Sequence, residues 1–193
     1  MRRLQTLILF SLVTLLSLSA VSAQDHRYDA GVSRELAEWR KATIKDVVYT
    51  LHFDLKEDRG EATIGFSLDT PQEVVIDLRN TDLVSDITID NESITTICTL
   101  ANEHIVIPTD ATHAGRNAIT IAFTIDNQSL NRKPDFLYTL LVPDRARTLF
   151  PCFDQPDMKA EYNLSLTLPE GWVAVSNTAV SSVDGNTVTF APT

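Results

Sequence analysis

Short segments of this chain alternate apolar and polar residues with a period of two, and no other feature constrains its fold as strongly. In residues 49–55, for example, four apolar side chains alternate with three polar or charged ones. The same pattern, or a short apolar run between turn residues, recurs in further segments: 62–68, 74–78, 87–89, 104–107, 119–125, 162–168, 172–175, 180–183 and 187–190. This is the period of a β-strand with one buried face. We therefore predict about ten short strands.

The polarity of these segments also indicates how they pack. Strands with one apolar and one polar face form antiparallel sheets over a shared core. Asp184-Gly185 lies between two strand-like segments and is a hairpin signal. No long helical segment alternates with the strands, which disfavours a parallel α/β sheet. The prediction is an all-β domain, either an antiparallel β-sandwich or a curved pair of sheets.

The first 23 residues are typical of a secretory signal peptide. Arg2 and Arg3 precede an apolar run over residues 4–18, and Val21-Ser22-Ala23 supplies small residues before Gln24. The run is short for a membrane anchor, which needs about 20 apolar residues. We expect cleavage after Ala23, export to the periplasm or the exterior, and no stable membrane span in the mature chain.

A short helix is predicted between the signal peptide and the β-domain. Residues 24–42 form a polar lead followed by a helix over 33–42, and the β-domain occupies residues 43–193. Ser33 is the expected N-cap of this helix. The apolar residues of one helix face are Leu36, Ala37 and Trp39.

The charge balance bears on the partners of the chain. The full sequence has a net charge of −10, and removal of residues 1–23 takes away two arginines and no acid, which gives −12. Such a chain repels nucleic acids and anionic membrane surfaces. We therefore predict no nucleic-acid partner.

No motif in the sequence supplies a catalytic centre. The four histidines lack the H-E-x-x-H spacing of a zinc helix, and His104 and His113 are nine residues apart without a cysteine partner. No nucleophile elbow or phosphate-binding loop occurs. We predict no catalytic residue, no metal ligand and no cofactor in this chain. For Cys98 and Cys152 we favour two buried free thiols, although export permits a disulfide.

Residues 135–160 form an unusual stretch, DFLYTLLVPDRARTLFPCFDQPDMKA. Its apolar first part lacks alternation and ends at Pro143. Gln155 precedes Pro156 and must therefore be extended. Arg147 is the candidate ion-pair partner of Asp154 in the turn that follows. We interpret this stretch as a rigid corner where two strands cross, rather than as a catalytic site.

This stretch resembles a segment of the zinc aminopeptidases of the aminopeptidase N type, A-R-x-x-F-P-C-F-D-E-P-x-x-K-A. Residues 146–160 carry it as ARTLFPCFDQPDMKA, and residues 169–177 are similar to the family's P-x-x-W-x-A-x-S-N run. The resemblance covers residues 39–193. Its structural motif residues are Arg147, Phe150, Pro151, Cys152, Phe153, Asp154 and Pro156.

The resemblance implies a curved β-saddle that packs against a separate catalytic domain and forms one wall of the active site. In that family the zinc and its ligands belong to the catalytic domain, so zinc and a peptide substrate are implied only in that context. The family's Gln or Glu that binds the substrate's amino terminus corresponds to Leu140 or Val142, which are neutral here. Gln155 also departs from the family, which has Glu at this position.

Two functions remain open from the sequence. The first is the non-catalytic N-terminal domain of an exported zinc metallo-aminopeptidase, inactive alone. It would be truncated at its C-terminal end, because residues 190–193 resemble the point before a late strand of the family. The alternative is a free-standing secreted module that binds peptides or proteins.

Overall fold

The structure is a computed structural model that describes residues 25–193. The predicted signal peptide of residues 1–23 lies outside the described residues. Thirteen strands form three sheets in the described part. The strands are β1 (Ile44–Asp54), β2 (Arg59–Leu68), β3 (Val74–Asp77), β4 (Val84–Ile89), β5 (Glu92–Ser93), β6 (Thr99–Ala101), β7 (His104–Ile107), β8 (Gly115–Thr124), β9 (Leu130–Arg132), β10 (Leu137–Thr139), β11 (Glu161–Thr167), β12 (Val180–Asp184) and β13 (Thr187–Phe190). The helices are α1 (Arg34–Thr43), η1 (His26–Tyr28), η2 (Thr81–Leu83), η3 (Thr95–Ile97), η4 (Thr109–Ala111) and η5 (Ala146–Thr148).

The largest sheet has eight strands in the order β12-β13-β11-β1-β2-β8-β4-β5. Its strands pair antiparallel except for β1 and β11, which are parallel and in register from Val48 with Glu161 to Asp54 with Thr167. The predicted antiparallel pairing is thus present throughout this sheet except at this one pair. The long connection between β1 and β11 allows the chain to return in the same direction, which a tight hairpin does not.

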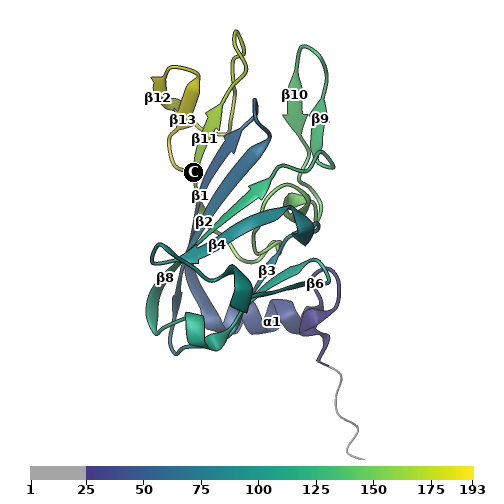
Figure 1. The fold of residues 1–193 in the computed structure, drawn as a ribbon, viewed down its shortest axis with the longest axis vertical. Coiled ribbons are helices and arrows are strands. Elements are labelled where there is room, and N and C mark those ends of the chain that lie inside the picture. Colours follow the sequence, from purple (N-terminus) through teal and green to yellow (C-terminus); the bar gives the residue numbers. More distant parts are fainter. Residues whose placement is uncertain (1–24) are drawn as a thin grey trace, which may run out of the picture.

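Two small sheets accompany the large one. One has the order β3-β7-β6 and the other pairs β10 with β9. In Figure 1 the β9–β10 hairpin stands beside the large sheet at the upper end of the molecule, and β3, β6 and α1 lie at the lower end. The alternating apolar side chains of β1, β2, β8 and β4 are buried in one core with those of the small sheets. An all-β, sandwich-like domain with one short α-helix, as predicted, is confirmed.

Helix α1 begins where the sequence predicts. The Ser33 side chain accepts a hydrogen bond from the Leu36 backbone N–H at 3.1 Å, which satisfies one of the free donors at the helix start. Leu36 is buried, whereas Ala37 and Trp39 are only half-buried. The second fully buried side chain of the helix is Arg40, four residues after Leu36 on the same face.

One predicted strand is absent from the sheets. Residues 172–175 have no strand partner, although Trp172 and Ala174 are half-buried and Val173 and Val175 are exposed. The period of two is thus present without the pairing that defines a strand. A β-segment needs a neighbouring backbone to hydrogen-bond with, and no described residue lies in that position.

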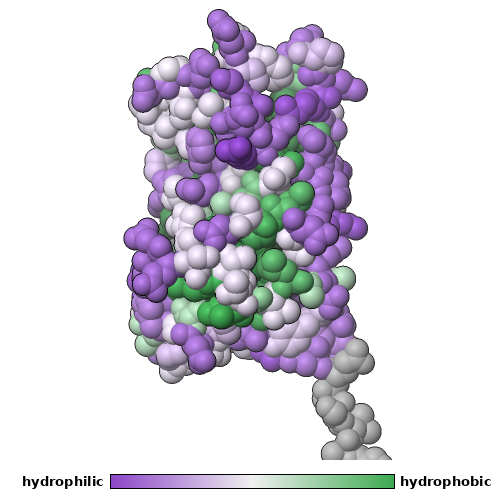
Figure 2. Space-filling view, in the orientation of Figure 1, coloured by the Kyte–Doolittle hydropathy of each residue, from purple (hydrophilic) through white to green (hydrophobic). Residues whose placement is uncertain are grey.

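The surface of the described residues combines polar and apolar areas. On the face shown in Figure 2, hydrophilic residues occupy the margins and apolar residues gather near the middle. Within residues 25–193, no helix has the length and apolar character that a bilayer crossing requires.

Candidate functional site

The segment that carries the sequence motif is joined to the end of β3. Cys152 and Asp77 exchange two backbone hydrogen bonds of 2.8 and 3.0 Å. The next two backbone N–H groups also bind the core: that of Phe153 donates to the Tyr49 hydroxyl at 2.9 Å, and that of Asp154 donates to Asp77 Oδ2 at 2.9 Å. Four hydrogen bonds therefore attach this segment, called the corner below, to β3 and to Tyr49 of β1.

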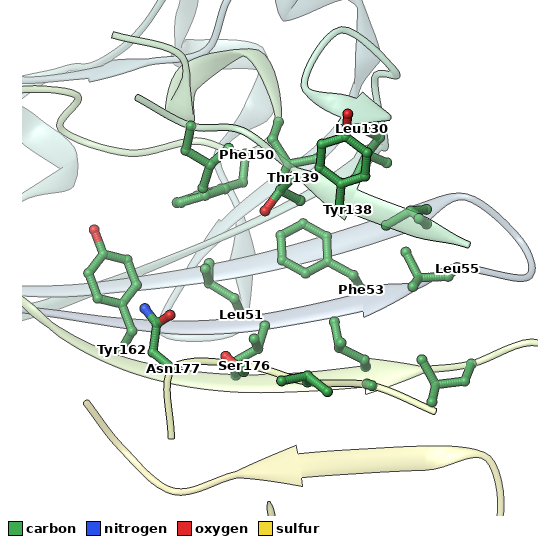
Figure 3. A pocket seen from close by; sticks show the side chains of 18 of the residues that line it. Leu51, Phe53, Leu55, Leu130, Tyr138, Thr139, Phe150, Tyr162, Ser176 and Asn177 are labelled. Carbon is green, nitrogen blue, oxygen red and sulfur yellow. The ribbon is translucent and has the colours of Figure 1, made fainter. Parts of the chain in front are cut away.

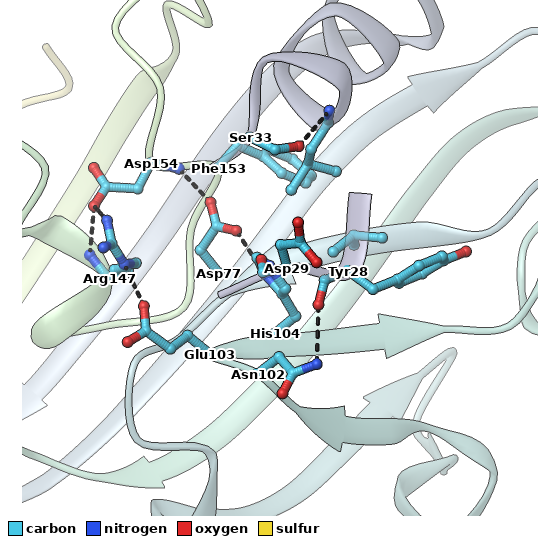
Figure 4. Close-up of polar contacts among 12 residues, drawn as sticks. Tyr28, Asp29, Ser33, Asp77, Asn102, Glu103, His104, Arg147, Phe153 and Asp154 are labelled. Carbon is cyan, nitrogen blue, oxygen red and sulfur yellow. Dashed lines mark hydrogen bonds and ion pairs between the residues drawn. The ribbon is translucent and has the colours of Figure 1, made fainter. Parts of the chain in front are cut away.

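Arg147 lies between Asp154 and Glu103, as Figure 4 shows. Its guanidinium contacts the carboxylates of Asp144 and Glu103, the latter at 3.2 Å, and lies 3.5 Å from Asp154 Oδ2. Its backbone N–H donates to the same Asp154 oxygen at 3.1 Å. The predicted pairing of Arg147 with Asp154 is therefore present. Burial nevertheless raises the pKa of the Asp154 carboxyl, and these contacts only partly oppose that effect.

A second ion pair connects the corner to α1. Arg40 donates to both Asp77 oxygens at 2.8 and 2.6 Å, and both side chains are 0% exposed. Burial alone disfavours the charged Asp77 carboxyl, but the Arg40 charge and the hydrogen bonds outweigh it and lower the pKa of Asp77. Arg40 also donates to the Val75 carbonyl at 3.1 and 2.8 Å. This guanidinium thus joins the helix to β3.

His104 completes this cluster on the side of the N-terminal lead. Its Nε2 lies 2.8 Å from the Asp29 carbonyl oxygen, and its Nδ1 lies 3.0 Å from Asp77 Oδ1 without the alignment of a hydrogen bond. Asn102 donates from its side chain to the Tyr28 carbonyl at 3.0 Å. Residues 28 and 29 are thereby held against β7 and the turn before it.

The apolar residues of the motif fill the core beside the corner. Phe150 meets Tyr49 and Phe53 edge-on, with ring centroids 6.3 and 6.1 Å apart. Phe153 meets Phe66 edge-on at 6.2 Å, and the Arg40 guanidinium lies 5.4 Å from its ring centre. The motif residues Phe150, Pro151, Cys152 and Phe153 are buried, and Pro156 is exposed.

Gln155 is buried in the corner and faces α1. Its Nε2 donates to the Ala37 carbonyl at 3.1 Å and to Asp157 Oδ1 at 3.0 Å. A glutamate at this position would lack the amide donors that make these two bonds. The departure from the family motif therefore has a local structural reason.

An apolar cleft of about 770 Å³ opens above β1 and β11. Its floor is formed by alternating side chains of these two strands, including Leu51, Phe53 and Leu164. Figure 3 shows the floor between Tyr138 of the β9–β10 hairpin on one side and Ser176 on the other. The remaining boundaries are Leu149 and Phe150 of the corner and the chain end at Ala191 and Thr193. The segment that carries the sequence motif therefore borders the cleft.

Leu140 and Val142 follow β10 and do not line this cleft. They are 51% and 85% exposed, whereas Thr139 and Leu141, which alternate with them, line it. The structure thus places both positions beside the cleft with their side chains in solvent. Neither offers a charge or a hydrogen-bond acceptor to a bound amino terminus.

The described residues do not fit a zinc ion. Among residues 25–193, no three His, Cys, Asp or Glu side chains are grouped as metal ligands. His104 binds the Asp29 carbonyl, and the His113 ring lies 3.1 Å from the Ala114 carbonyl oxygen. The two histidines therefore do not form a metal pair.

Both cysteines are free thiols in the structure, as favoured from the sequence. Cys152 is buried, and burial raises its pKa well above the ordinary value. Cys98 is only half-buried, so the expectation that both are buried was wrong; burial raises its pKa to about 11.

Several residues of the charge cluster were not predicted from the sequence: Arg40, Asp77, Glu103 and His104. Asp77 offered the clearest signal, because it interrupts the apolar run 74–78 at a position that the strand buries. A buried acid requires a cationic partner. The sequence alone did not identify which arginine is the cationic partner of Asp77.

A model of the peptidase M1 N-terminal domain matches residues 45–193. The chain belongs to this family. Aminopeptidase N of Streptomyces lividans is 31% identical over 157 residues, which make up 76% of this chain and 16% of that protein. The resemblance to aminopeptidases of this type, first inferred from residues 146–177, is thus confirmed.

Solved M1 structures share the fold of this M1 N-terminal domain. Legionella pneumophila aminopeptidase A in complex with aspartic acid aligns with a TM-score of 0.65 and 15% identity, over 77% of this chain and 19% of that one. An M1 zinc metallopeptidase from Deinococcus radiodurans aligns with a TM-score of 0.57 and 20% identity, over 77% and 38% respectively. The chain therefore spans a minor part of each of these relatives.

Proposed function

We propose that this chain is the non-catalytic N-terminal domain of an exported zinc aminopeptidase, in which it forms one wall of the substrate cleft. The observation that carries the proposal is the family match over residues 45–193, in a chain whose described residues contain no grouped metal ligands. Zinc and the peptide-bond chemistry then belong to a catalytic domain outside this chain.

The buried corner supports the proposed role as a wall. A surface that positions a substrate has to be rigid, because misplacement of about 1 Å is costly for catalysis. The corner is held by buried ion pairs of Arg40 and Arg147 and by aromatic contacts of Phe150 and Phe153. We infer that it fixes the neighbouring segment 140–142 at the edge of the substrate cleft.

The neutral side chains at Leu140 and Val142 bear on the substrate in this proposal. An aliphatic group does not compensate the desolvation of a bound ammonium group. A complete enzyme with this domain would take its amine anchor from another residue. It would also have a weaker preference for free amino termini than relatives with Gln or Glu at this position.

The direct test is a domain exchange. The segment of Streptomyces lividans aminopeptidase N that aligns with this chain would be replaced by the chain, and release of an amino-acid p-nitroanilide would be measured. We expect chelator-sensitive activity, and a lower KM when Leu140→Glu or Val142→Glu is introduced. Val183→Glu, at an exposed side chain of β12 that does not line the cleft, is the control for a carboxylate added elsewhere.

A misfolded exchange protein would be recognised by its circular dichroism, and the chain would then be added in trans to the remainder of the same enzyme. Restored activity or a stable complex supports the proposal. A folded exchange protein without activity contradicts it, and so does a misfolded one whose parts neither associate nor regain activity in trans.

Export is tested separately. The chain, expressed with residues 1–23 in a host with a secretory pathway, is expected outside the cytoplasm with an amino terminus at Gln24. An intact amino terminus in the cytoplasm would contradict this part of the proposal.

The second candidate, a secreted module that binds peptides or proteins, is favoured by one observation. The cleft is apolar and open, and clefts of this kind are the usual binding sites of proteins. Binding of a partner without any associated catalytic domain would favour this candidate.

A further inference from the structure

The N-terminal lead, residues 25–31, is attached to the sheets by few contacts. In the described part of the chain, no backbone–backbone hydrogen bond joins it to a strand. Asn102 donates to the Tyr28 carbonyl at 3.0 Å, and the Tyr28 hydroxyl donates to Glu73. The third contact is made by the ring of His104. Because segments held by so few hydrogen bonds open locally at a low free-energy cost, each of these contacts matters for the position of the lead.

His104 is 1% exposed, and each of its ring nitrogens faces a hydrogen-bond acceptor (Figure 4). Nε2 lies 2.8 Å from the Asp29 carbonyl oxygen, and Nδ1 lies 3.0 Å from Oδ1 of Asp77. The carbonyl has no proton to donate. Burial disfavours the charged Asp77 carboxyl, but the Arg40 charge and the hydrogen bonds outweigh burial and lower its pKa. This carboxylate therefore also only accepts.

A neutral imidazole at His104 does not satisfy both contacts. It carries one N–H, so its other nitrogen would direct a lone pair at an acceptor oxygen. The imidazolium has two N–H groups and is attracted to both oxygens. Its Nδ1 is not aligned with Asp77 as in a hydrogen bond, but the attraction between the two charges does not depend on that alignment. The contacts therefore fit a positively charged His104 while the lead is in place.

The surroundings of His104 compensate this charge. Asp77 Oδ1 contacts both His104 and Arg40, so a carboxylate lies between the two cations. The charged groups on the elements packed around His104 are Asp29 of the lead, Arg40 of α1, Asp77 of β3, Glu103 before β7, and Arg147 and Asp154 of the corner. Carboxyl groups outnumber guanidinium groups in this set.

We propose that the lead is a pH-dependent latch, which His104 holds closed when both of its ring nitrogens are protonated and releases when one proton is lost. When the lead opens, water reaches His104, and an imidazole in water loses its second proton near pH 6.5, about the middle of the physiological range. Above this pH the open form binds fewer protons than the closed form. The open fraction therefore rises as the pH rises.

The latch covers the charge cluster that joins α1, β3 and the corner. A Cβ atom at Gly31 of the lead would lie 3.7 Å from Nη2 of Arg147, and His104 connects the lead to Asp77. Opening of the lead would therefore admit water to these buried ion pairs. All of these residues belong to the described part of the chain, and the latch requires neither zinc nor a catalytic domain.

Trypsin cleavage after Arg27 measures the open fraction. Arg27 is half-buried and its guanidinium pairs with Asp25 at 2.6 Å, so the cleavage rate follows the population in which the lead is open. The product that begins at Tyr28 is identified by its mass. We expect the rate of the unmodified chain, divided by that of His104→Gln at the same pH, to rise at least about threefold between about pH 6 and 8. Glutamine keeps hydrogen-bond donors but does not titrate.

Division by the rate of His104→Gln removes two other effects of pH. The pH dependence of trypsin is common to both proteins. So is the titration of His26, whose ring pairs with the Asp29 carboxylate at 2.7 Å, a hydrogen bond that raises its pKa. Asn102→Gly is the matched control, because it removes the donor to the adjacent Tyr28 carbonyl and glycine tolerates the φ of 52° at this position. It should be cleaved faster than the unmodified chain by the same factor at every pH.

Nuclear magnetic resonance of the unmodified chain keeps the proposal testable if His104→Gln does not fold. Long-range proton–nitrogen spectra distinguish an imidazolium from the two neutral tautomers. At about pH 7, where an imidazole in water is mostly neutral, we expect protons on both ring nitrogens of His104. A neutral His104 at this pH would overturn the proposal. So would a rate ratio to His104→Gln that stays constant or falls as the pH rises, or the absence of cleavage after Arg27 in both the unmodified chain and Asn102→Gly.

Discussion

Arg40 donates hydrogen bonds to both carboxylate oxygens of Asp77, and the two side chains are completely buried between α1 and β3. Breaking such a pair from one side leaves an uncompensated charge in the core. We expect Arg40→Ala to lower the free energy of unfolding by about 3–5 kcal/mol. Urea denaturation followed by circular dichroism measures this loss.

The control for Arg40→Ala is Arg34→Ala on the same helix. Arg34 pairs with Glu38 at 2.7 Å on the exposed surface. Exposed pairs of this spacing contribute about 0.3–0.5 kcal/mol, so this variant should unfold almost as the unmodified chain does. Equal losses of unfolding free energy in both variants would mean that the buried pair contributes no more to stability than the exposed one.

The close approach of two strands makes Gly60 sensitive to substitution. A Cβ atom at Gly60 would lie 2.3 Å from Cζ of Phe123, whose ring is packed in the core. We expect Gly60→Ala to cost about 1–3 kcal/mol, because the ring and its neighbours have to shift.

Gly65→Ala is the matched control on the same strand, β2. The nearest atom to its Cβ is Nη2 of Arg116 at 2.6 Å, the end of a flexible and exposed side chain. This variant should cost less than Gly60→Ala, and the reverse order in denaturation midpoints would contradict the packing described here.

Alkaline pH should destabilise the fold through Tyr162. Burial raises the pKa of this hydroxyl to about 12, and a tyrosine in an unfolded chain ionises near pH 10. The stabilising contribution is complete below about pH 10. Between about pH 10 and 12 the unfolded state binds fewer protons than the folded state, so stability falls as pH rises.

Tyr162→Phe should therefore show a shallower loss of thermal stability over this pH interval. Tyr138→Phe, at an exposed ring, is the control for removing a hydroxyl. Parallel stability profiles of Tyr162→Phe and the unmodified chain would refute the assignment. Tyr28, whose pKa burial also raises to about 12, contributes in the same direction.

The two thiols should differ in reactivity. Cys152 is buried and Cys98 half-buried, and burial raises the pKa of both. In the native chain at pH 8, we expect Cys98 to react slowly with Ellman's reagent and Cys152 only on unfolding. The unfolded chain should release two equivalents without a reductant. The absence of free thiols would demonstrate a disulfide and contradict the structure.

The period of two predicts the strands because side chains alternate across a sheet, and residues 49–54 of the segment 49–55 lie in β1 as expected. Which strands pair with one another, and in which direction, was harder to predict from the sequence. The parallel alignment of β1 with β11 depends on a long connection, and the period of a strand does not specify the direction of its neighbour. The segment 172–175 shows the converse case, in which a strand-like sequence has no partner.

The site was predictable only in part. The pairing of Arg147 with Asp154 could be anticipated because the two residues are only seven positions apart, on either side of a turn. Arg40, by contrast, lies in a helix rich in charged residues, and only the tertiary structure brings it to Asp77, which is 37 positions away. The cleft also escaped prediction, because its floor and sides come from distant segments that each look like ordinary strands.

The central claim is that this chain is a non-catalytic M1 N-terminal domain, and its most direct test is an aminopeptidase assay. The purified chain, supplied with zinc, would be incubated with alanine p-nitroanilide, with and without a metal chelator, and compared with a complete M1 aminopeptidase. The account predicts no release of p-nitroaniline above that of buffer. Chelator-sensitive release by the chain alone, retained through further purification, would contradict it.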